Sequence, residues 1–229
     1  ASGVEDLNTF TDAVERKDAW AYTRRPQDLV ELVEFWREHG RIGGRLELVR
    51  SSAARRLNER NQAHAEWQPL AADRVRAAAC RIAAACILTH EATIQVPDGS
   101  AGGSGLRLEA VLPDWNAREL GSLLSRPLFD EAIYGAVRFH HREAREYLAA
   151  EWFADLLRRE TSRTRIEALF FRRQYDLDVI VPTMRPVLPW LALLDDRIRE
   201  RLLHVAPQVL FEGGDPSQLP KPTREAVLR

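Results

Sequence analysis

Two adjacent histidines, His140 and His141, stand where the sequence pattern changes from that of a strand to that of a helix. Apolar and polar residues alternate over 137–139, and apolar residues then recur at helical spacing over 144–152. Imidazoles titrate near neutral pH and bind ligands or metal ions. A turn between a strand and a helix can aim one of these rings at a ligand. On spacing alone, an ordinary turn with one exposed ring is the simpler interpretation.

The other patterns that resemble catalytic motifs are incomplete. His141-Arg142-Glu143 has the H-x-E spacing of zinc deaminases, but no P-C-x-x-C follows it, and Cys80 and Cys86 both lie upstream. The sequence contains no G-x-x-x-x-G-K-[ST] phosphate loop and no G-x-S-x-G nucleophile turn. No set of residues has the spacing of a metal site. We therefore expect no enzymatic activity, no metal and no bound cofactor in this chain itself.

The composition predicts one large or two small packed domains, since 45% of the 229 residues are hydrophobic. A net charge of −1 argues against a general attraction to nucleic acid or membrane. No apolar run approaches the roughly 20 residues that span a bilayer. Cys80 and Cys86 lie in an alanine-rich helical stretch, which predicts buried thiols in a reducing cytoplasm. Met184 is the only methionine, so we expect the chain to be a piece of a longer protein.

The first part of the chain has helical patterning. Pro26 suits the first position of a helix, and Gly40 suits the left-handed residue that ends one. The helices expected in this part cover residues 6–22, 26–40, 44–61 and 69–89.

The pattern then changes to the alternation of strands, over 93–96 and 106–110, with a glycine-rich loop over 98–105 between them. Asp114 can cap a helix that runs to Arg126.

From Ser162 onward the chain is expected to be helical again. Asp195-Asp196 is predicted to cap a helix rather than to form a catalytic carboxylate pair. A turn is expected over 213–216, and Pro222 is expected to begin a further helix.

One motif resembles a known family. Phe139-His140-His141, four further residues and Glu146-Tyr147-Leu148-Ala149-Ala150 are similar to the F-x-H-x-x-x-x-E-[YF]-x-A-A signature of the winged-helix domain in NACHT-type STAND NTPases. These are signal-transduction ATPases with numerous domains. The resemblance implies that His141 contacts the β-phosphate of bound ADP and helps to hold the closed state.

A second block, from Arg24-Arg25-Pro26 through Trp36 and Gly40 to Arg45, resembles the helical domain that follows the ATPase core in these proteins. The resemblance implies that Pro26 packs near the adenine of the nucleotide. A proline that only begins a helix, with no ligand nearby, is the alternative.

The fold class expected from these patterns is mainly α. It comprises a helical domain over 1–62 that follows an NTPase core outside this chain, a winged-helix domain with a few short strands over 63–160, and the start of a HEAT-like helical array over 161–229. The resemblance implies a regulatory switch that couples nucleotide state to ligand sensing. Its partners would be an ATPase core in cis, ADP or ATP with magnesium bound by that parent protein, further copies on activation, and a sensed ligand. Roles in bacterial defence or signalling are implied by the family alone.

Two other functions are weighed against this one. A winged-helix regulator needs a basic helix against DNA phosphates. The helix after the histidines carries Arg142 and Arg145 but also Glu143, Glu146 and Glu151, so nucleic acid is not the expected partner. A non-catalytic helical scaffold is the second alternative.

Overall fold

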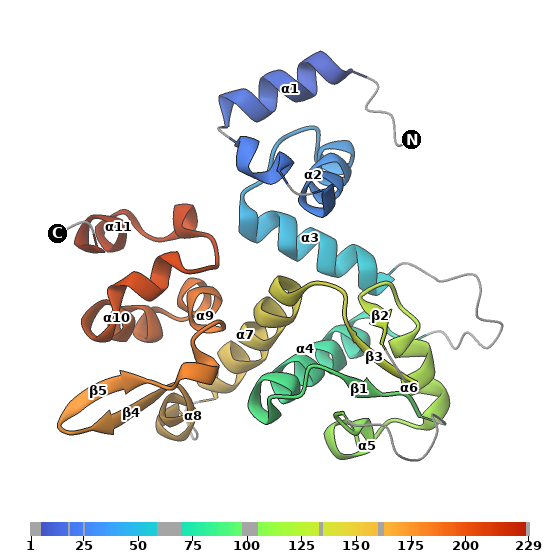
Figure 1. Ribbon diagram of the computed structural model, residues 1–229, viewed down its shortest axis with the longest axis vertical. Coiled ribbons are helices and arrows are strands. Elements are labelled where there is room, and N and C mark those ends of the chain that lie inside the picture. The colour runs from blue at the N-terminus through green and yellow to red at the C-terminus, as the bar shows by residue number, and fades with distance from the viewer. Residues whose placement is uncertain are drawn as a thin grey trace. The chain divides into compact units, whose positions relative to one another are not determined.

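The computed structural model describes residues 6–17, 19–24, 26–58, 70–97, 105–132, 135–159 and 163–227 (Figure 1). The described chain is mainly helical with a few short antiparallel strands, which confirms the expected fold class at this level. It divides into two compact units, Ala1–Ser52 and Ala53–Arg229, and each is described by itself. Within the described ranges, no helix is long and apolar enough to cross a membrane.

The first unit contains α1 (Leu7–Arg16), the 3₁₀ helix η1 (Ala19–Thr23), α2 (Pro26–His39) and the start of α3 (Arg45–Asn58). Asp6 caps α1 by accepting a hydrogen bond from the Thr9 N–H at 3.1 Å. The single helix expected over 6–22 is wrong, because α1 ends at Arg16. The helix after this break is of the 3₁₀ type, and it buries Ala19 in the core that α1 also faces.

Helix α2 begins and ends where the sequence predicts. Pro26 is its first residue, and Gly40 follows it with a φ of +65° while its N–H donates to the Trp36 carbonyl at 2.7 Å. The ring of Phe35 lies so close to Gly43 that a Cβ there would be 2.7 Å from it. The buried core of the unit consists of Phe10, Ala13, Val14, Ala19, Leu32, Phe35, Ile42 and Leu48.

The centre of the second unit is the packed pair α4 (Ala72–Thr89) and α7 (Arg142–Arg158), with α9 (Leu188–Leu194) on α7 (Figure 1). Alanines on both α4 and α7 are buried, which lets the two helices approach closely. Consecutive residues of α7, from Glu146 to Ala150, are all buried, because the helix is covered on several sides rather than on one face. Trp152 is only half-buried.

A three-stranded antiparallel sheet lies beside these helices. It consists of β1 (Ile94–Gln95), β2 (Phe129–Glu131) and β3 (Ala136–Phe139) in the order β1-β3-β2. Between β1 and β2 the chain forms α5 (Leu108–Val111) and α6 (Ala117–Leu124). Strand β3 agrees with the alternation over 137–139.

The strand expected over 106–110 is wrong. Leu106 makes only a single parallel bridge to Ile94, and α5 begins two residues later. The turn of α5 closes when the Leu112 N–H donates to the Leu108 carbonyl at 2.7 Å, and it buries Leu108 in the core. Of the expected loop over 98–105, residues 98–104 lie outside the described residues.

The expected cap of the following helix is also wrong. Asn116, not Asp114, caps α6 and accepts from the Glu119 N–H at 2.9 Å. The Glu119 carboxylate accepts from the Asn116 N–H at 3.0 Å, which completes a capping box.

The last part of the chain is not helical throughout. After α8 (Arg163–Phe170), a hairpin of β4 (Phe171–Gln174) and β5 (Leu177–Ile180) replaces the helix that the sequence suggests. Asp195 caps the next helix as predicted, accepting from the Ile198 N–H at 3.0 Å. The remaining elements are η3 (Pro182–Met184), α10 (Asp196–Val205), η4 (Pro207–Phe211), η5 (Pro216–Gln218) and α11 (Lys221–Val227).

Candidate functional site: a histidine pair at a strand-to-helix junction

The junction between β3 and α7 holds both histidines. The His140 N–H continues the strand pairing past the end of β3 by donating to the Leu128 carbonyl at 2.9 Å. His141 then occupies the N-cap position of the 17-residue helix α7, with an extended backbone. Its carbonyl accepts the first helical hydrogen bond from the Arg145 N–H at 3.2 Å. The junction therefore places the two imidazoles at the positive end of a long helix.

His140 is held by a carboxylate on the neighbouring strand. Antiparallel pairing sets Asp130 of β2 opposite Arg138, so His140 is its diagonal neighbour. The His140 Nδ1 lies 2.7 Å from both carboxylate oxygens of Asp130. Because an ionised carboxylate only accepts, Nδ1 is the donor, and Nε2 remains the ring atom directed elsewhere.

His141 is half-buried and packs against the ring of His140. The two ring centroids are 4.2 Å apart, and the ring planes lie at 80° to each other, an edge-to-face contact. The His140 ring, which is hydrogen-bonded to Asp130, therefore packs against one side of the His141 ring. An imidazole N–H beside a helix N-terminus can donate a hydrogen bond to an oxyanion such as a phosphate.

Glu146, the acidic residue of the signature, lies inside the fold rather than at the junction surface. Its side chain is buried, and it accepts a hydrogen bond from Arg142 Nε at 2.6 Å. Burial raises the pKa of this carboxyl group, and the ion pair with Arg142 offsets only part of that increase. The bond from Arg142 to Glu146 thus links the first turn of α7 to the next turn of the same helix.

A polar cluster between α4 and α7 has no counterpart in the sequence analysis. Glu151 on α7 accepts from Arg76 at 2.7 Å through both oxygens and also accepts from the Tyr147 hydroxyl. The Cys80 thiol lies 3.6 Å from the same carboxylate. Burial, with a smaller contribution from Glu151, raises the pKa of Cys80 to about 12, so this thiol is neutral and unreactive near neutral pH.

The second cysteine has a similar environment. Burial raises the pKa of Cys86 to about 11. Both thiols are free and buried, which confirms the prediction that they are small buried residues. Across the described ranges, no three histidine, cysteine or acidic side chains are grouped so that they could hold a metal ion.

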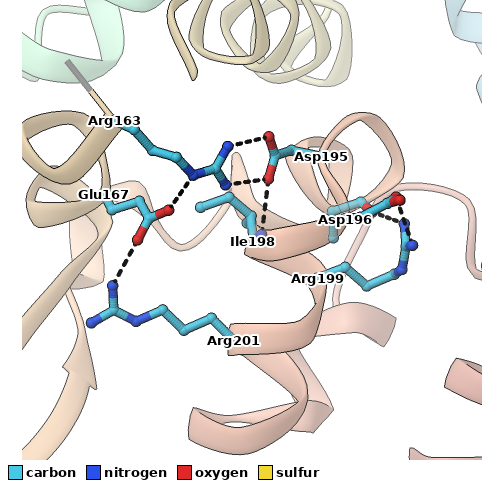
Figure 2. A network of polar contacts seen from close by, with 8 residues as sticks. Arg163, Glu167, Asp195, Asp196, Ile198, Arg199 and Arg201 are labelled. Atoms are coloured by element: carbon cyan, nitrogen blue, oxygen red, sulfur yellow. Dashed lines mark hydrogen bonds and ion pairs between the residues drawn. The ribbon is translucent and has the colours of Figure 1, made fainter. Parts of the chain in front are cut away.

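Another ion-pair cluster joins α8 to α10. Figure 2 shows Arg163 reaching Asp195 through two hydrogen bonds of 3.0 and 2.7 Å, while its Nε donates to Glu167 at 2.8 Å. Arg201 donates to the other oxygen of Glu167 at 3.1 Å. Burial opposes the ionisation of Asp195, but hydrogen bonds from Arg163 and from backbone N–H groups outweigh it and lower its pKa. Every charged residue labelled in Figure 2 has a partner, which is typical of ion pairs that hold neighbouring elements together.

The second residue of the predicted site, Pro26, lies in the other unit. It is the exposed first residue of α2, with Asp28 in the same first turn. Pro26 belongs to the first unit and His141 to the second, and each is described only within its own unit. The sequence alone did not reveal Asp130, because the short strand β2 has no alternation long enough to recognise.

Comparison with protein-family models, curated proteins and solved structures finds no match for this chain.

Proposed function

We propose that this chain is the regulatory segment of a NACHT-type STAND NTPase, in which His141 binds the diphosphate of a nucleotide held by an ATPase core. The observation that carries the proposal is the position of His141 at the N-cap of α7, directly after β3. His141 is also the residue that matches the histidine of the family signature that the sequence resembles. Helix N-termini attract phosphate through their free N–H groups and their dipole, and an imidazole N–H adds one donor.

The order of elements supports a winged-helix domain within residues 63–160. Helix α4, strand β1, helices α5 and α6, and strands β2 and β3 follow one another, and the sheet order is β1-β3-β2. Winged helices have this order of three helices and three strands. In the proposal, residues 1–62 form the helical domain next to the core, and residues 161–229 begin a HEAT-like sensor array.

The charge distribution favours a switch over a DNA-binding regulator. In a winged helix the helix before the β2–β3 pair enters the DNA groove, and here that helix is α6. Its charged residues are Arg118 and Glu119, and Glu119 is already bound to Arg74. Such a helix offers no basic face to phosphates.

In this proposal the parent protein binds ADP or ATP with magnesium, and the present chain reports which nucleotide is bound. Capture of a ligand by the C-terminal array releases the closed form, and further copies then assemble. The setting proposed for this switch is a bacterial defence or signalling response in the cytoplasm. This setting is proposed by analogy with the family.

The proposal is tested by calorimetric titration of ADP into the parent protein, including its ATPase core. His141→Ala is compared with wild type and with His204→Ala, because His204 is an exposed residue of α10 whose Nδ1 lies 2.7 Å from the Glu200 carbonyl oxygen of the same helix. We expect His141→Ala to weaken ADP binding by about 10- to 150-fold, the range for a hydrogen bond to a charged group. His204→Ala should leave the affinity unchanged.

Two results would count against the proposal at different levels. ADP binding that is equal in wild type and His141→Ala removes His141 from the nucleotide site but keeps the parent protein as a nucleotide-binding switch. Absence of any ADP binding by the parent protein removes the switch itself and favours the helical scaffold.

A further inference from the structure

The β4–β5 hairpin has a turn that its sequence should disfavour. Tyr175 and Asp176 form the two-residue connection, with φ values of +49° and +62°. Two-residue turns with both φ values positive are normally made of Asn-Gly or related pairs. A bulky residue such as tyrosine rarely adopts a positive φ, and outliers of this kind concentrate at functional positions. The turn therefore holds a tyrosine at its tip in a strained backbone conformation.

The tip is exposed while the base of the hairpin is firmly anchored. Tyr175 is 92% exposed and Leu177 is 68% exposed. At the base, Phe171 is buried, and the Arg201 guanidinium lies 4.4 Å from the centre of its ring. Arg201 also donates to Asp178 of β5 at 3.0 Å, in addition to the bond to Glu167 seen in Figure 2. A fixed base that presents an exposed tip lowers the entropy lost on binding.

The pairing register sorts the hairpin side chains into two faces. Arg173 and Asp178 pair with each other, so they share the face that carries Phe171 and contacts α10. The charges of this face are matched, since Asp178 binds Arg201 and Arg173 lies 3.3 Å from Asp176. The opposite face, here called the outer face, carries Arg172, Gln174, Leu177 and Val179.

The outer face and the tip combine apolar surface with one unmatched positive charge. Within the described part of the chain, no carboxylate pairs with Arg172. Tyrosine and arginine are the residue types that most often dominate binding energy at protein interfaces. The chemistry that complements this surface is an apolar groove with a carboxylate at its rim.

The acidic residues of the hairpin decide which class of partner fits. Asp176, with a side chain that is 95% exposed, stands directly beside Tyr175. Asp176 pairs with Arg173 and Asp178 pairs with Arg201, so within the described residues Arg172 is a single unmatched charge on the outer face. The phosphates of nucleic acids and of anionic membranes are bound by clusters of basic residues, whereas the outer face carries a single arginine beside Leu177 and Val179. A protein groove has no such phosphates.

We propose that the tip of this hairpin, Tyr175 with Leu177 and Arg172, is a docking anchor that inserts into an apolar groove of a partner protein. A carboxylate of the partner meets Arg172, and the groove receives the tyrosine ring and Leu177. This docking does not depend on nucleotide binding at His141.

The turn provides a matched pair of variants. Asp176→Gly and Tyr175→Asn each place a favoured residue at a positive φ, so each should raise Tm by about 2–4 °C. Only Tyr175→Asn removes the ring. If Tyr175 has only a structural role, the two variants should bind the partner equally well. If Tyr175 docks, only Tyr175→Asn should bind it more weakly.

The experiment places the photoreactive residue p-benzoylphenylalanine at position 175 of the full parent protein in the cells that make it. Irradiation should yield a covalent protein adduct, which mass spectrometry identifies. The identified partner is then purified and titrated with wild type and variants. We expect Asp176→Gly to bind as wild type does, Tyr175→Asn to bind at least about 30-fold more weakly, and Arg172→Glu about 10-fold more weakly. Changing the partner's rim carboxylate to lysine should restore binding to Arg172→Glu.

Three outcomes overturn the docking proposal. The first is that irradiation gives no protein adduct. The second is that the adducts contain only RNA or lipid, which would assign the tip to a different class of partner. The third is a purified partner that binds Tyr175→Asn as tightly as Asp176→Gly. None of these results bears on ADP binding, so the two proposals fail independently.

Discussion

The α4–α7 pair and the corner formed by α8, the β4–β5 hairpin and α10 are held together in different ways. Helices α4 and α7 pack closely against each other, and both carry fully buried apolar residues, such as Ile82 on α4 and Leu148 on α7. At the corner, the joints are the bonds from Arg163 to Asp195 and from Arg201 to Glu167 and Asp178. Apolar burial is non-directional and gains strength with area, whereas ion pairs set geometry and weaken in salt.

The polar clusters of the two regions sharpen this difference. Arg76 and Glu151 lie within an apolar interface, where a lost partner leaves a poorly hydrated charge. At the corner, several groups share their partners, since Glu167 binds both Arg163 and Arg201, so the loss of one bond is partly compensated. The first region should therefore determine stability, and the second should determine where the hairpin points.

The largest expected effect comes from the core of the first region. Leu148→Ala removes a fully buried side chain of α7. We expect the free energy of unfolding to fall by about 2–5 kcal/mol, as measured by urea denaturation. Leu177→Ala, on the exposed hairpin, is the control and should change it by about 0.5 kcal/mol or less. Equal losses from both variants would contradict the assignment of stability to the α4–α7 pair.

The next effect is the loss of the acidic partner between α4 and α7. Glu151→Gln leaves Arg76 without its carboxylate in a half-buried position and should lower the free energy of unfolding by about 1–3 kcal/mol. Replacing both residues with methionine should recover most of this loss, because no buried charge remains. A double variant less stable than Glu151→Gln would show that the ion pair itself stabilises the interface.

At the corner the expected effects are smaller and depend on salt. Asp195→Ala removes both the cap of α10 and the partner of Arg163, which should lower the free energy of unfolding by about 1–2 kcal/mol. Asp195→Asn keeps a capping side chain and should lose about 1 kcal/mol or less, since Arg163 retains Glu167. The deficit of Asp195→Asn should shrink in about 1 M salt, where charges are screened over about 3 Å. A salt-independent deficit would argue that the ion pair contributes nothing there.

The smallest expected effects concern how the free energy of unfolding depends on pH, which should be opposite for one carboxyl group in each region. The pKa of Asp195 is lowered in the folded state, so its contribution is present above its ordinary pKa of 3.8 and is lost as the pH falls through the folded value. The pKa of Glu146 is raised by burial, so its ionisation costs stability above the folded value, and this cost vanishes below 4.5. Urea titrations between about pH 3 and pH 7 should show Glu146→Gln gaining on wild type as the pH rises, and Asp195→Asn falling behind it. The same slope for both variants would contradict these assignments.

Local signals in the sequence were sufficient where a few neighbouring residues determine the backbone. Pro26 begins α2, Gly40 ends it and Asp195 caps α10, because the geometry of a helix end depends on its own turn. The alternation before His140 and the helical pattern after His141 likewise predict the strand-to-helix junction. The strand expected over 106–110 was wrong because strand-like pairing is limited to the two backbone hydrogen bonds of Leu106 with Thr93 and Gln95, and a helical turn that buries Leu108 begins directly after it.

The sequence by itself therefore determined the mainly helical class, the junction that carries the two histidines and the burial of both cysteines. Only the tertiary structure decided which side chains meet: Asp130 with His140, and Arg76 with Glu151 across 75 residues of chain. It also decided that Phe171–Ile180 forms a hairpin, since its short strands gain stability from Arg201 on α10 rather than from their own pattern. Contacts between distant residues have no periodicity, so they follow from packing and not from local order.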